Sequence, residues 1–350
     1  MTPVPDRPLA DWPLVGVAGA RGVVGNAFLA ILADAGLPAD RLRAFGSGDG
    51  SVSFGSADVP IRPLDAAATA GLDVLFLATD GAASREIVAG PGRDVPLIVD
   101  NSSAFRLDPA VPLVVPEVNG DVLATYGGTL VANPNCTTAA TVLALAPIHD
   151  AAGLASVDLA SYQAVSGAGR AGLDAYEAER AAGGSRQAAG SPFHGRIADS
   201  VVPQIDVLDD EGWTGEERKI MAELRKILGL PDLDVAATAV RVPVHTGHSV
   251  AVHLTTRRPA TVEQLEEALR AAPGVEYRPA DGSLRHPMPL DVAGRDPVLV
   301  GRLRSIPGRE RGFSLFLASD NLRKGAALNA IQVAACVDPE RLGRLVPPSR

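Results

Sequence analysis

The chain has 350 residues, of which 46% are hydrophobic and 21% are charged, a composition typical of a globular protein with room for two domains. Its net charge of −9 and the lack of any Lys/Arg run argue against a nucleic-acid-binding protein, and no apolar run is long enough to span a membrane. The two cysteines, Cys136 and Cys336, form no disulfide framework or metal-ligand pattern, so we expect no metal and a reducing cytoplasm.

The first part of the chain alternates short apolar strands with helices. We expect strands at 13–20, 41–47, 72–80 and 95–103, and helices at 26–36 and near 84–90. Such alternation is typical of a doubly wound parallel sheet that binds ligands at the carboxyl ends of its strands. The fold class is therefore α/β, with a Rossmann-like dinucleotide-binding domain over residues 1–135.

The pattern changes after Cys136. Alternating segments at 156–165, 234–244 and 248–256 predict strands with one buried face, and Thr261 and Gln264 have the spacing of a capping box that opens a helix. A loop is expected at 180–196. These features predict a second, α+β domain over residues 136–322. A last apolar helix, within about 323–350, is expected to complete the first domain and to hold Cys336 in its core.

A glycine-rich turn, GARGVVG at residues 19–25, follows the first strand and opens the first helix. Its glycines would let the backbone approach a pyrophosphate, and the helix N-terminus would supply N–H groups. The G-x-x-G-x-x-G spacing is not the commoner one, so an ordinary turn is the alternative. Asp49 lies just past the second strand. Its carboxylate could bind a ribose hydroxyl, or it could equally be a solvent-exposed carboxylate of a loop.

Cys136 lies where a helix is expected to begin. Pro134 and Asn135 predict a turn and an N-cap, and the helix should run over 137–145 until Pro147 stops it. The first helical turn favours a thiolate because its free N–H groups and its dipole stabilise negative charge. A buried cysteine that acts only as a small hydrophobe is the alternative.

Three further side chains suit a cysteine nucleophile. Gln163 ends a strand before a glycine turn, and Arg241 and His248 flank an expected hairpin loop. A thiol needs a positioned proton carrier, which an imidazole can provide, although His248 on an apolar face can also be a core residue. Lysine is rare in the chain, which contains only Lys219, Lys226 and Lys324. In such a chain a lysine can indicate a position that requires a compact ammonium group in place of a guanidinium.

Together these residues resemble the aspartate-β-semialdehyde dehydrogenase family, from about Val15 to Ala335. The likeness lies in seven blocks: DNSSAFR (100–106), VPLVVPEVN (111–119), ANPNCTT (132–138), YQAVSGAG (162–169), ELRKILG (223–229), RVPVHTGHS (241–249) and SDNLRKGAALNAIQ (319–332). The resemblance implies a homodimer with a catalytic and dimerisation domain, acting in amino-acid biosynthesis on the lysine, threonine and methionine pathway.

The resemblance also implies catalytic roles. Cys136 would form a thioester with the aspartyl group, and His248 would be the acid/base that takes the thiol proton. Gln163 would orient the substrate, and Asn135 would support the phosphate or oxyanion site. Hydride from NADP(H) would then reduce the thioester to L-aspartate 4-semialdehyde, reversibly, after phosphate leaves L-aspartyl-4-phosphate.

Binding residues follow from the same resemblance. Arg241 would clamp the α-carboxylate and Glu223 would meet the ammonium, while Arg106 and Lys226 would hold phosphate. The implied cofactor site comprises Gly19, Arg21, Gly22, Val23, Val24, Gly25, Ser47, Thr79, Ser166, Gly167 and Asn321.

The cofactor half departs from the family. Arg21 replaces a threonine of the family's turn, and FGSGDGSVSF, after the second strand, has Asp49 in place of an arginine that grips the 2′-phosphate of NADP. NAD is therefore an alternative cofactor. The rival functions are an acyl-phosphate or acyl-thioester reductase for another dicarboxylate and a catalytically silent nucleotide-binding homologue. A divergent paralogue of a specialised pathway is also an open alternative.

Overall fold

A computed structural model describes residues 11–184, 186–282 and 286–350, and its chain divides into two compact units. Unit 1 comprises residues 1–134 and 326–349, and unit 2 comprises residues 135–325 with Arg350. The mixed α/β architecture confirms the expected fold class.

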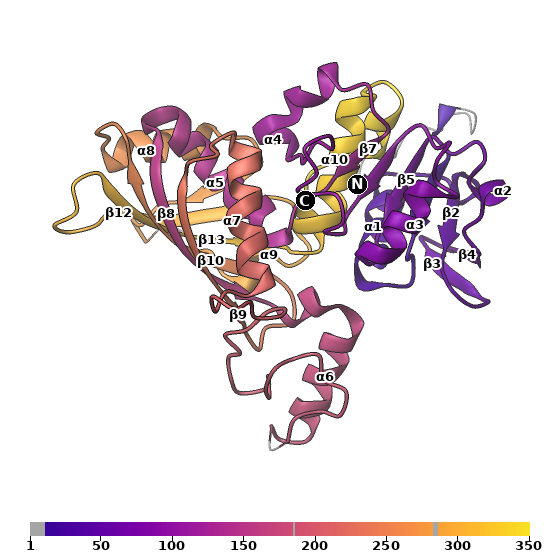
Figure 1. Cartoon of the computed structure of the whole chain (residues 1–350), viewed down its shortest axis with the longest axis horizontal. Coiled ribbons are helices and arrows are strands. Elements are labelled where there is room, and N and C mark those ends of the chain that lie inside the picture. Colours follow the sequence, from indigo (N-terminus) through magenta and orange to yellow (C-terminus); the bar gives the residue numbers. More distant parts are fainter. Residues whose placement is uncertain (1–10, 185, 283–285) are drawn as a thin grey trace. The chain divides into compact units, whose positions relative to one another are not determined.

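Unit 1 is built on a seven-stranded sheet in the order β3-β4-β2-β1-β5-β6-β7 (Figure 1). Every neighbouring pair is parallel except β3 and β4. The strands are β1 (Val15–Ala18), β2 (Leu42–Phe45), β3 (Ser51–Phe54), β4 (Ala57–Arg62), β5 (Val74–Leu77), β6 (Ile98–Asp100) and β7 (Leu130–Ala132). From β1, strands β2, β4 and β3 follow on one side of the sheet and β5, β6 and β7 on the other. The strand order therefore reverses at β1, directly before the glycine turn.

Helices cover both faces of this sheet. Val15, Val17, Val74 and Phe76 point to a core shared with α1 (Val23–Asp34) and α10 (Leu328–Val337), whereas alternate residues such as Leu75 and Leu77 face α3 (Gly81–Ala89). The short helices are α2 (Ala66–Thr69) and α4 (Pro116–Asn119), with 3₁₀ turns at Ala39–Arg41, Gly120–Thr125 and Leu342–Leu345. The last helix, α10, packs in this core. The expectation that Cys336 lies in this core is wrong, because Cys336 is exposed on the last turn of α10.

Unit 2 contains a six-stranded mixed sheet in the order β11-β12-β13-β10-β8-β9 (Figure 1). Its strands are β8 (Leu154–Gln163), β9 (Asp234–Arg241), β10 (His248–Thr256), β11 (Val275–Arg278), β12 (Val298–Ser305) and β13 (Gly312–Ser319). Its helices are α5 (Cys136–Ala152), α6 (Gly169–Ala181), α7 (Gly215–Leu228), α8 (Val262–Ala271) and α9 (Pro289–Val292), with a 3₁₀ turn at Val165–Ala168 and a π-helical turn at Arg323–Ala327. In the sheet, Gln163 of β8 stands beside Arg241 of parallel β9.

The prediction that Pro147 ends the cysteine helix is wrong. Helix α5 continues through Pro147 to Ala152, and Gly153, with a φ of +70°, follows its end. An interior proline costs about 3 kcal/mol of helix stability, but α5 packs against α7, α8 and the sheet, and Val142, Leu145 and Ile148 are wholly buried. Burial of these side chains outweighs the missing hydrogen bond.

Candidate active site

Cys136 is the first residue of α5, and Asn135 caps this helix as expected. The Asn135 side chain accepts hydrogen bonds from the backbone N–H groups of Thr137 (2.8 Å) and Thr138 (3.3 Å). Cys136 is partly buried and forms no disulfide. The sulfur is therefore attached to the first helical turn, where the dipole favours a thiolate.

Gly325 packs directly on this cysteine. A Cβ atom at position 325 would lie 2.9 Å from Cys136 Cβ, closer than real Cβ atoms approach, and 3.3 Å from Cys136 Cα. Gly325 thus belongs to the site, although it was not among the residues predicted from the sequence. A glycine inside the otherwise apolar helical stretch at 323–337 was the available signal.

A buried carboxylate, Glu216, connects the predicted residues. Its Oε1 accepts hydrogen bonds from Asn135 Nδ2 (2.7 Å) and Gln163 Nε2 (3.1 Å), and its Oε2 lies 3.0 Å from Lys219 Nζ. Burial raises the pKa of Glu216, but the charge of Lys219 and the amide hydrogen bonds outweigh burial, so the net pKa is lowered. Glu216 is therefore ionised.

Lys219 is the ammonium partner of two carboxylates. Besides Glu216 it binds Asp206 Oδ2 at 3.0 Å. Burial lowers the pKa of Lys219, but the two carboxylates outweigh burial and the net pKa is raised. The side chain of Lys219 is 27% exposed, so this charged residue is partly in contact with solvent.

The start of α7 is fixed by a capping box. Thr214 Oγ1 accepts the N–H of Glu217 (3.3 Å), and Glu217 Oε2 accepts the N–H of Thr214 (2.8 Å). Glu217 also accepts the N–H of Ala239 in β9, which ties the helix to the sheet. Glu216 and Lys219 consequently lie in the first two turns of α7.

The other predicted carboxylate, Glu223, lies two turns further along the same helix. It is wholly buried, and its Oε2 accepts the backbone N–H of Asn135 at 2.6 Å. Helix α7 thus presents one carboxylate to the side chain and one to the main chain of Asn135. The motif E-x-x-K occurs twice, at 216–219 and 223–226, and the seven-residue spacing puts both copies on one helix face. The sequence pattern predicted Glu223 and Lys226 as binding residues, and it did not single out Glu216 or Lys219 for binding.

Arg241 is a buried cation at the end of β9. Its side chain donates to Ala164 O (2.8 Å) and lies 6.0 Å from the centroid of the Phe193 ring. Within the part of the chain that the structure describes, no carboxylate lies within ion-pair distance. Burial lowers the pKa of Arg241, while the charges of Glu216 and Cys136 favour its protonated form. A buried guanidinium without an ion-pair partner is costly unless an anion binds.

His248, the first residue of β10, is held in one tautomer. Its Nδ1 accepts the backbone N–H of Ala164 at 3.0 Å, so the neutral ring carries its hydrogen on Nε2. Nε2 is buried and has no hydrogen-bond partner among the described residues. Burial, and then the charge of Arg241, lower the pKa of His248 well below its usual value. The expected role as acceptor of the thiol proton does not fit this tautomer, because Nε2–H is a donor.

Gly167 makes room for both of these side chains. A Cβ there would lie 2.6 Å from Arg241 Nη1 and 3.2 Å from His248 Nε2. Next to it, Ser166 Oγ accepts from Asn321 Nδ2 (3.0 Å), and Asn321 Oδ1 accepts the N–H of Gly247 (2.9 Å). The turn expected to face the nicotinamide is therefore cross-linked by Asn321.

The glycine turn of unit 1 fits a dinucleotide. A Cβ on Gly19, whose φ is +74°, would lie 2.3 Å from Ala78 O, and one on Gly25 would lie 2.2 Å from Gly19 O. Gly22 is the N-cap of α1, without a side chain to cover the N–H groups, and Val23 and Val24 begin the helix. The glycines thus provide the tight turn, the open helix N-terminus and the close helix packing that a pyrophosphate site needs.

Other predicted binding residues of unit 1 lie in the segments that follow strands of the sheet. Thr79, after β5, shares a 3.0 Å hydrogen bond with Ser84, which donates to the buried Asp100. Arg106 is buried and donates from Nε to Asn133 O (2.9 Å) and from Nη2 to Asn101 O (2.7 Å). Arg21 reaches the loop after β2, where it donates to the carbonyl groups of Ser47 and Asp49.

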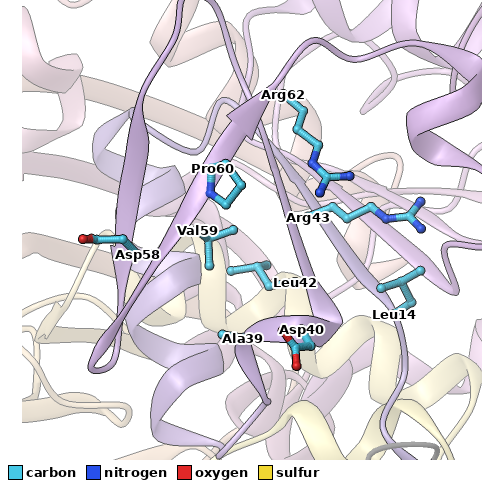
Figure 2. A pocket seen from close by; sticks show the side chains of 9 residues that line it. All are labelled: Leu14, Ala39, Asp40, Leu42, Arg43, Asp58, Val59, Pro60 and Arg62. Atoms are coloured by element: carbon cyan, nitrogen blue, oxygen red, sulfur yellow. The ribbon is translucent and has the colours of Figure 1, made fainter.

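A separate cavity of about 320 Å³ lies in unit 1, between β2 and β4 and the turn before β2 (Figure 2). Figure 2 shows the guanidinium groups of Arg43 and Arg62 on one side of it and the carboxylate of Asp58 on the other. Arg43 also donates to the carbonyl oxygens of Ala68 and Ala70. None of the predicted site residues lines this cavity.

Across the described ranges, no group of three or more His, Cys, Asp or Glu side chains is arranged to hold a metal ion. In the same ranges, no helix has the length and apolar character needed to cross a bilayer.

A dinucleotide-binding unit joined to a mixed-sheet unit with a helix-capped cysteine defines a nucleotide-dependent oxidoreductase. Residues 14–126 match the family model "Semialdehyde dehydrogenase, NAD binding domain", and residues 145–324 match "Semialdehyde dehydrogenase, dimerisation domain". The chain belongs to the aspartate-semialdehyde dehydrogenase family.

Relatives and solved structures agree with this assignment. The aspartate-semialdehyde dehydrogenase of Aquifex aeolicus is 38% identical over 94% of this chain and 98% of its own. That of Corynebacterium melassecola is 41% identical over 91% and 98%. The crystal structure of aspartate-semialdehyde dehydrogenase II from Vibrio cholerae, complexed with ASA, superposes with a TM-score of 0.87 at 34% identity and covers 93% of this chain and 98% of that one.

Proposed function

We propose that the chain catalyses the reversible reductive dephosphorylation of L-aspartyl-4-phosphate to L-aspartate 4-semialdehyde through a thioester on Cys136. The observation that carries this proposal is the buried guanidinium of Arg241, which has no carboxylate within ion-pair distance in the described residues and whose pKa is lowered chiefly by burial. Such a cation calls for an anionic group on the ligand, and the α-carboxylate of an aspartyl substrate supplies one.

Glu216 supports an amino-acid substrate. It is ionised, buried and bonded to Gln163, which stands beside Arg241 in the sheet. A guanidinium and a carboxylate on neighbouring positions suit the carboxylate and ammonium of one amino acid. We therefore propose Glu216 as an ammonium ligand because it bonds Gln163 beside Arg241, with Glu223 as the alternative; both carboxylates also accept hydrogen bonds from Asn135. An N-acylated substrate lacks the ammonium and fits less well.

The chain's own groups perform the acyl-transfer steps. The α5 N-terminus and Arg241 stabilise the Cys136 thiolate that attacks the acyl phosphate. Nε2–H of His248 donates to the oxygen of the tetrahedral adduct, and Gln163 and Asn135 position the acyl group. Arg106 and Lys226 are the proposed cations for phosphate. A bound nicotinamide supplies or accepts the hydride.

For the cofactor we propose NADP, with NAD as the alternative, held by the glycine turn and by Ser47, Thr79, Ser166, Gly167 and Asn321. Families of this type act with NAD(P), as the matched NAD-binding domain supports. The matched dimerisation domain supports a homodimer. The cytoplasmic location stays a prediction.

The test is phosphate-dependent oxidation of L-aspartate 4-semialdehyde with each nicotinamide cofactor. Cys136→Ser should lower kcat by at least about a thousandfold, because oxygen is a poor nucleophile here. The matched control, Cys336→Ser, removes the exposed thiol and should leave the rate unchanged. Turnover that needs no phosphate, or a fully active Cys136→Ser variant, would overturn the proposal.

A further inference from the structure

Glu179 is a buried carboxylate of α6 that the proposed mechanism does not use. It is 1% exposed and accepts three backbone N–H groups from the segment that follows this helix. Its Oε1 accepts the N–H of Ala188 at 3.1 Å, and its Oε2 accepts those of Ile197 at 2.7 Å and Ala198 at 2.9 Å. These donors compensate the cost of burying the charge, so the carboxylate anchors both ends of segment 188–198 on α6.

Phe193 lies in the middle of this segment, and its side chain is buried. Gln187 donates from Nε2 to the carbonyl oxygen of Phe193 at 2.8 Å, which fixes the backbone at this position. A Cβ on Gly172 of α6 would lie only 3.1 Å from Phe193 Cζ. The glycine thus lets the ring pack closely on the helix, and the ring has a defined position.

The same stretch of chain contacts Arg241 in two ways. Val202 and Arg241 exchange two backbone hydrogen bonds, of 2.9 Å and 2.8 Å, along the free edge of β9. The guanidinium carbon of Arg241 lies over the Phe193 ring, 6.0 Å from its centroid. A cation over the face of an aromatic ring is attracted to it, and more strongly where solvent is excluded, as it is at these two buried residues.

The guanidinium of Arg241 is therefore held on several sides. Ala164 O accepts from Nη1 at 2.8 Å, Gly167 lacks the Cβ that would lie 2.6 Å from Nη1, and Phe193 supports the group through its ring. The other N–H groups of Arg241 have no acceptor in the described part of the chain. They are the groups that a ligand carboxylate can bind.

We propose that Phe193 is a specificity-determining residue, whose ring holds Arg241 in the orientation that binds the α-carboxylate of the substrate, and that Glu179 is the positioning residue that holds Phe193 there. This inference rests on the proposed function, in which Arg241 binds that carboxylate. Without the ring or its anchor, Arg241 keeps its charge, but the guanidinium can rotate. A planar, two-point contact with a carboxylate is then weakened.

The experiment measures how well an aldehyde protects Cys136 from iodoacetamide, in the full chain with Cys336→Ser and without phosphate or a nicotinamide cofactor. An aldehyde can bind under these conditions, but it is not oxidised. Phe193→Leu, which keeps an apolar side chain without a ring, should weaken protection by L-aspartate 4-semialdehyde roughly 3- to 30-fold. Protection by 3-aminopropanal, which lacks the α-carboxylate, should not change.

Glu179→Gln should weaken protection by L-aspartate 4-semialdehyde in the same direction. Added to Phe193→Leu, it should cause no further loss, because both residues act through one ring. Two matched controls should change protection by neither aldehyde. Glu177→Gln removes an exposed carboxylate from the same helix, and Phe313→Leu removes a buried ring elsewhere in unit 2.

Unchanged protection in Phe193→Leu, or an equal loss for both aldehydes in a variant with a normal circular dichroism spectrum, would overturn the role of Phe193. Full protection in Glu179→Gln would overturn the role of Glu179. If Phe193→Leu does not fold, Glu179→Gln alone decides, by the same comparison of the two aldehydes. Because nothing is oxidised in this assay, selective loss of protection without phosphate-dependent turnover of the wild type would contradict the proposed function and leave this inference standing.

Discussion

The main chain of Ala164 holds His248 in place: its N–H donates to Nδ1 over 3.0 Å, and its carbonyl oxygen accepts from Arg241 Nη1 over 2.8 Å. One residue therefore orients both the imidazole and the guanidinium of the site. Because Nδ1 is an acceptor, the neutral ring presents Nε2–H as a donor, and burial, followed by the charge of Arg241, opposes a second proton.

The first prediction concerns the source of the Cys136 thiolate. If His248 is a hydrogen-bond donor and not the base, His248→Gln should lower kcat/KM roughly 10- to 100-fold and leave the pKa of the Cys136 thiol unchanged. The pH dependence of iodoacetamide alkylation measures that pKa. A Cys336→Ser background is needed because Cys336 is exposed. A rise of about one pH unit or more in the alkylation midpoint would show that the imidazole accepts the thiol proton.

The second prediction is a pH dependence of stability. The folded-state pKa of His248 is depressed, so in acid the unfolded chain takes up a proton that the folded chain refuses. Stability should be full above the ordinary value of 6.5 and should fall below it by at most about 1.4 kcal/mol per pH unit from this group. Urea unfolding between pH 7.5 and 5 measures this slope. His248→Gln should flatten it, whereas His253→Gln, which changes an exposed residue of the same strand, should not. Equal slopes in both variants would contradict the assignment.

The third prediction separates the two carboxylates of α7. Glu216→Gln should raise KM for L-aspartate 4-semialdehyde and lower kcat/KM roughly 10- to 100-fold, since the charged partner of the ammonium is lost. With an N-acylated substrate, which has no ammonium group, kcat/KM of Glu216→Gln should be little lower than kcat/KM of the wild type. Glu223→Gln should instead lower the urea midpoint, because a buried acceptor of Asn135 N–H loses its charge. If Glu223→Gln alone raised KM, the ammonium would be assigned to Glu223.

The fourth prediction tests the carboxylate clamp. Arg241→Lys keeps a positive charge but removes the planar fork, so kcat/KM for aspartate semialdehyde should fall roughly 100-fold. For 3-aminopropanal, which lacks the α-carboxylate, wild type and variant should be within a few-fold of each other. A similar loss with both aldehydes would mean that Arg241 acts on the reacting carbon or on the fold.

The fifth prediction concerns Gly325. A methyl group there would press on Cys136, so Gly325→Ala should lower kcat and slow alkylation of Cys136 at least about tenfold, while the chain stays folded. Gly343→Ala is the matched control, because a Cβ at 343 meets no atom within 4 Å. Normal alkylation in Gly325→Ala would show that the helix start adapts.

The alternation of strand and helix segments in the first half of the chain predicted the parallel sheet. Its strands could be recognised because buried parallel strands are nearly continuous apolar runs. The edge hairpin of β3 and β4 was missed although SVSF and ADVPIR alternate between exposed and buried residues, because both strands are short and the second contains Pro60. The end of α5 was predicted too early because local helix propensity at Pro147 does not include the burial of Ile148 and its neighbours. Cys336 looked like core because α10 is apolar, yet its last turn is exposed.

At the site, Asn135 and Cys136 were predictable because capping is local. Glu216 was not, since nothing within α7 distinguishes it from Glu223; only the fold brings Gln163 to one of them. The tautomer of His248 depends on a peptide 84 positions away in the chain and has no sequence signature.

The capping box at Thr214 also sets the register of the site. An α-helix turns by about 100° per residue, so one residue inserted between Thr214 and Glu216 would swing the carboxylate away from Gln163 and bring a neighbour round in its place. The same insertion in the loop before Thr214 would leave the count from cap to carboxylate intact. We therefore expect the site to tolerate a one-residue insertion before Thr214 and not one directly after it.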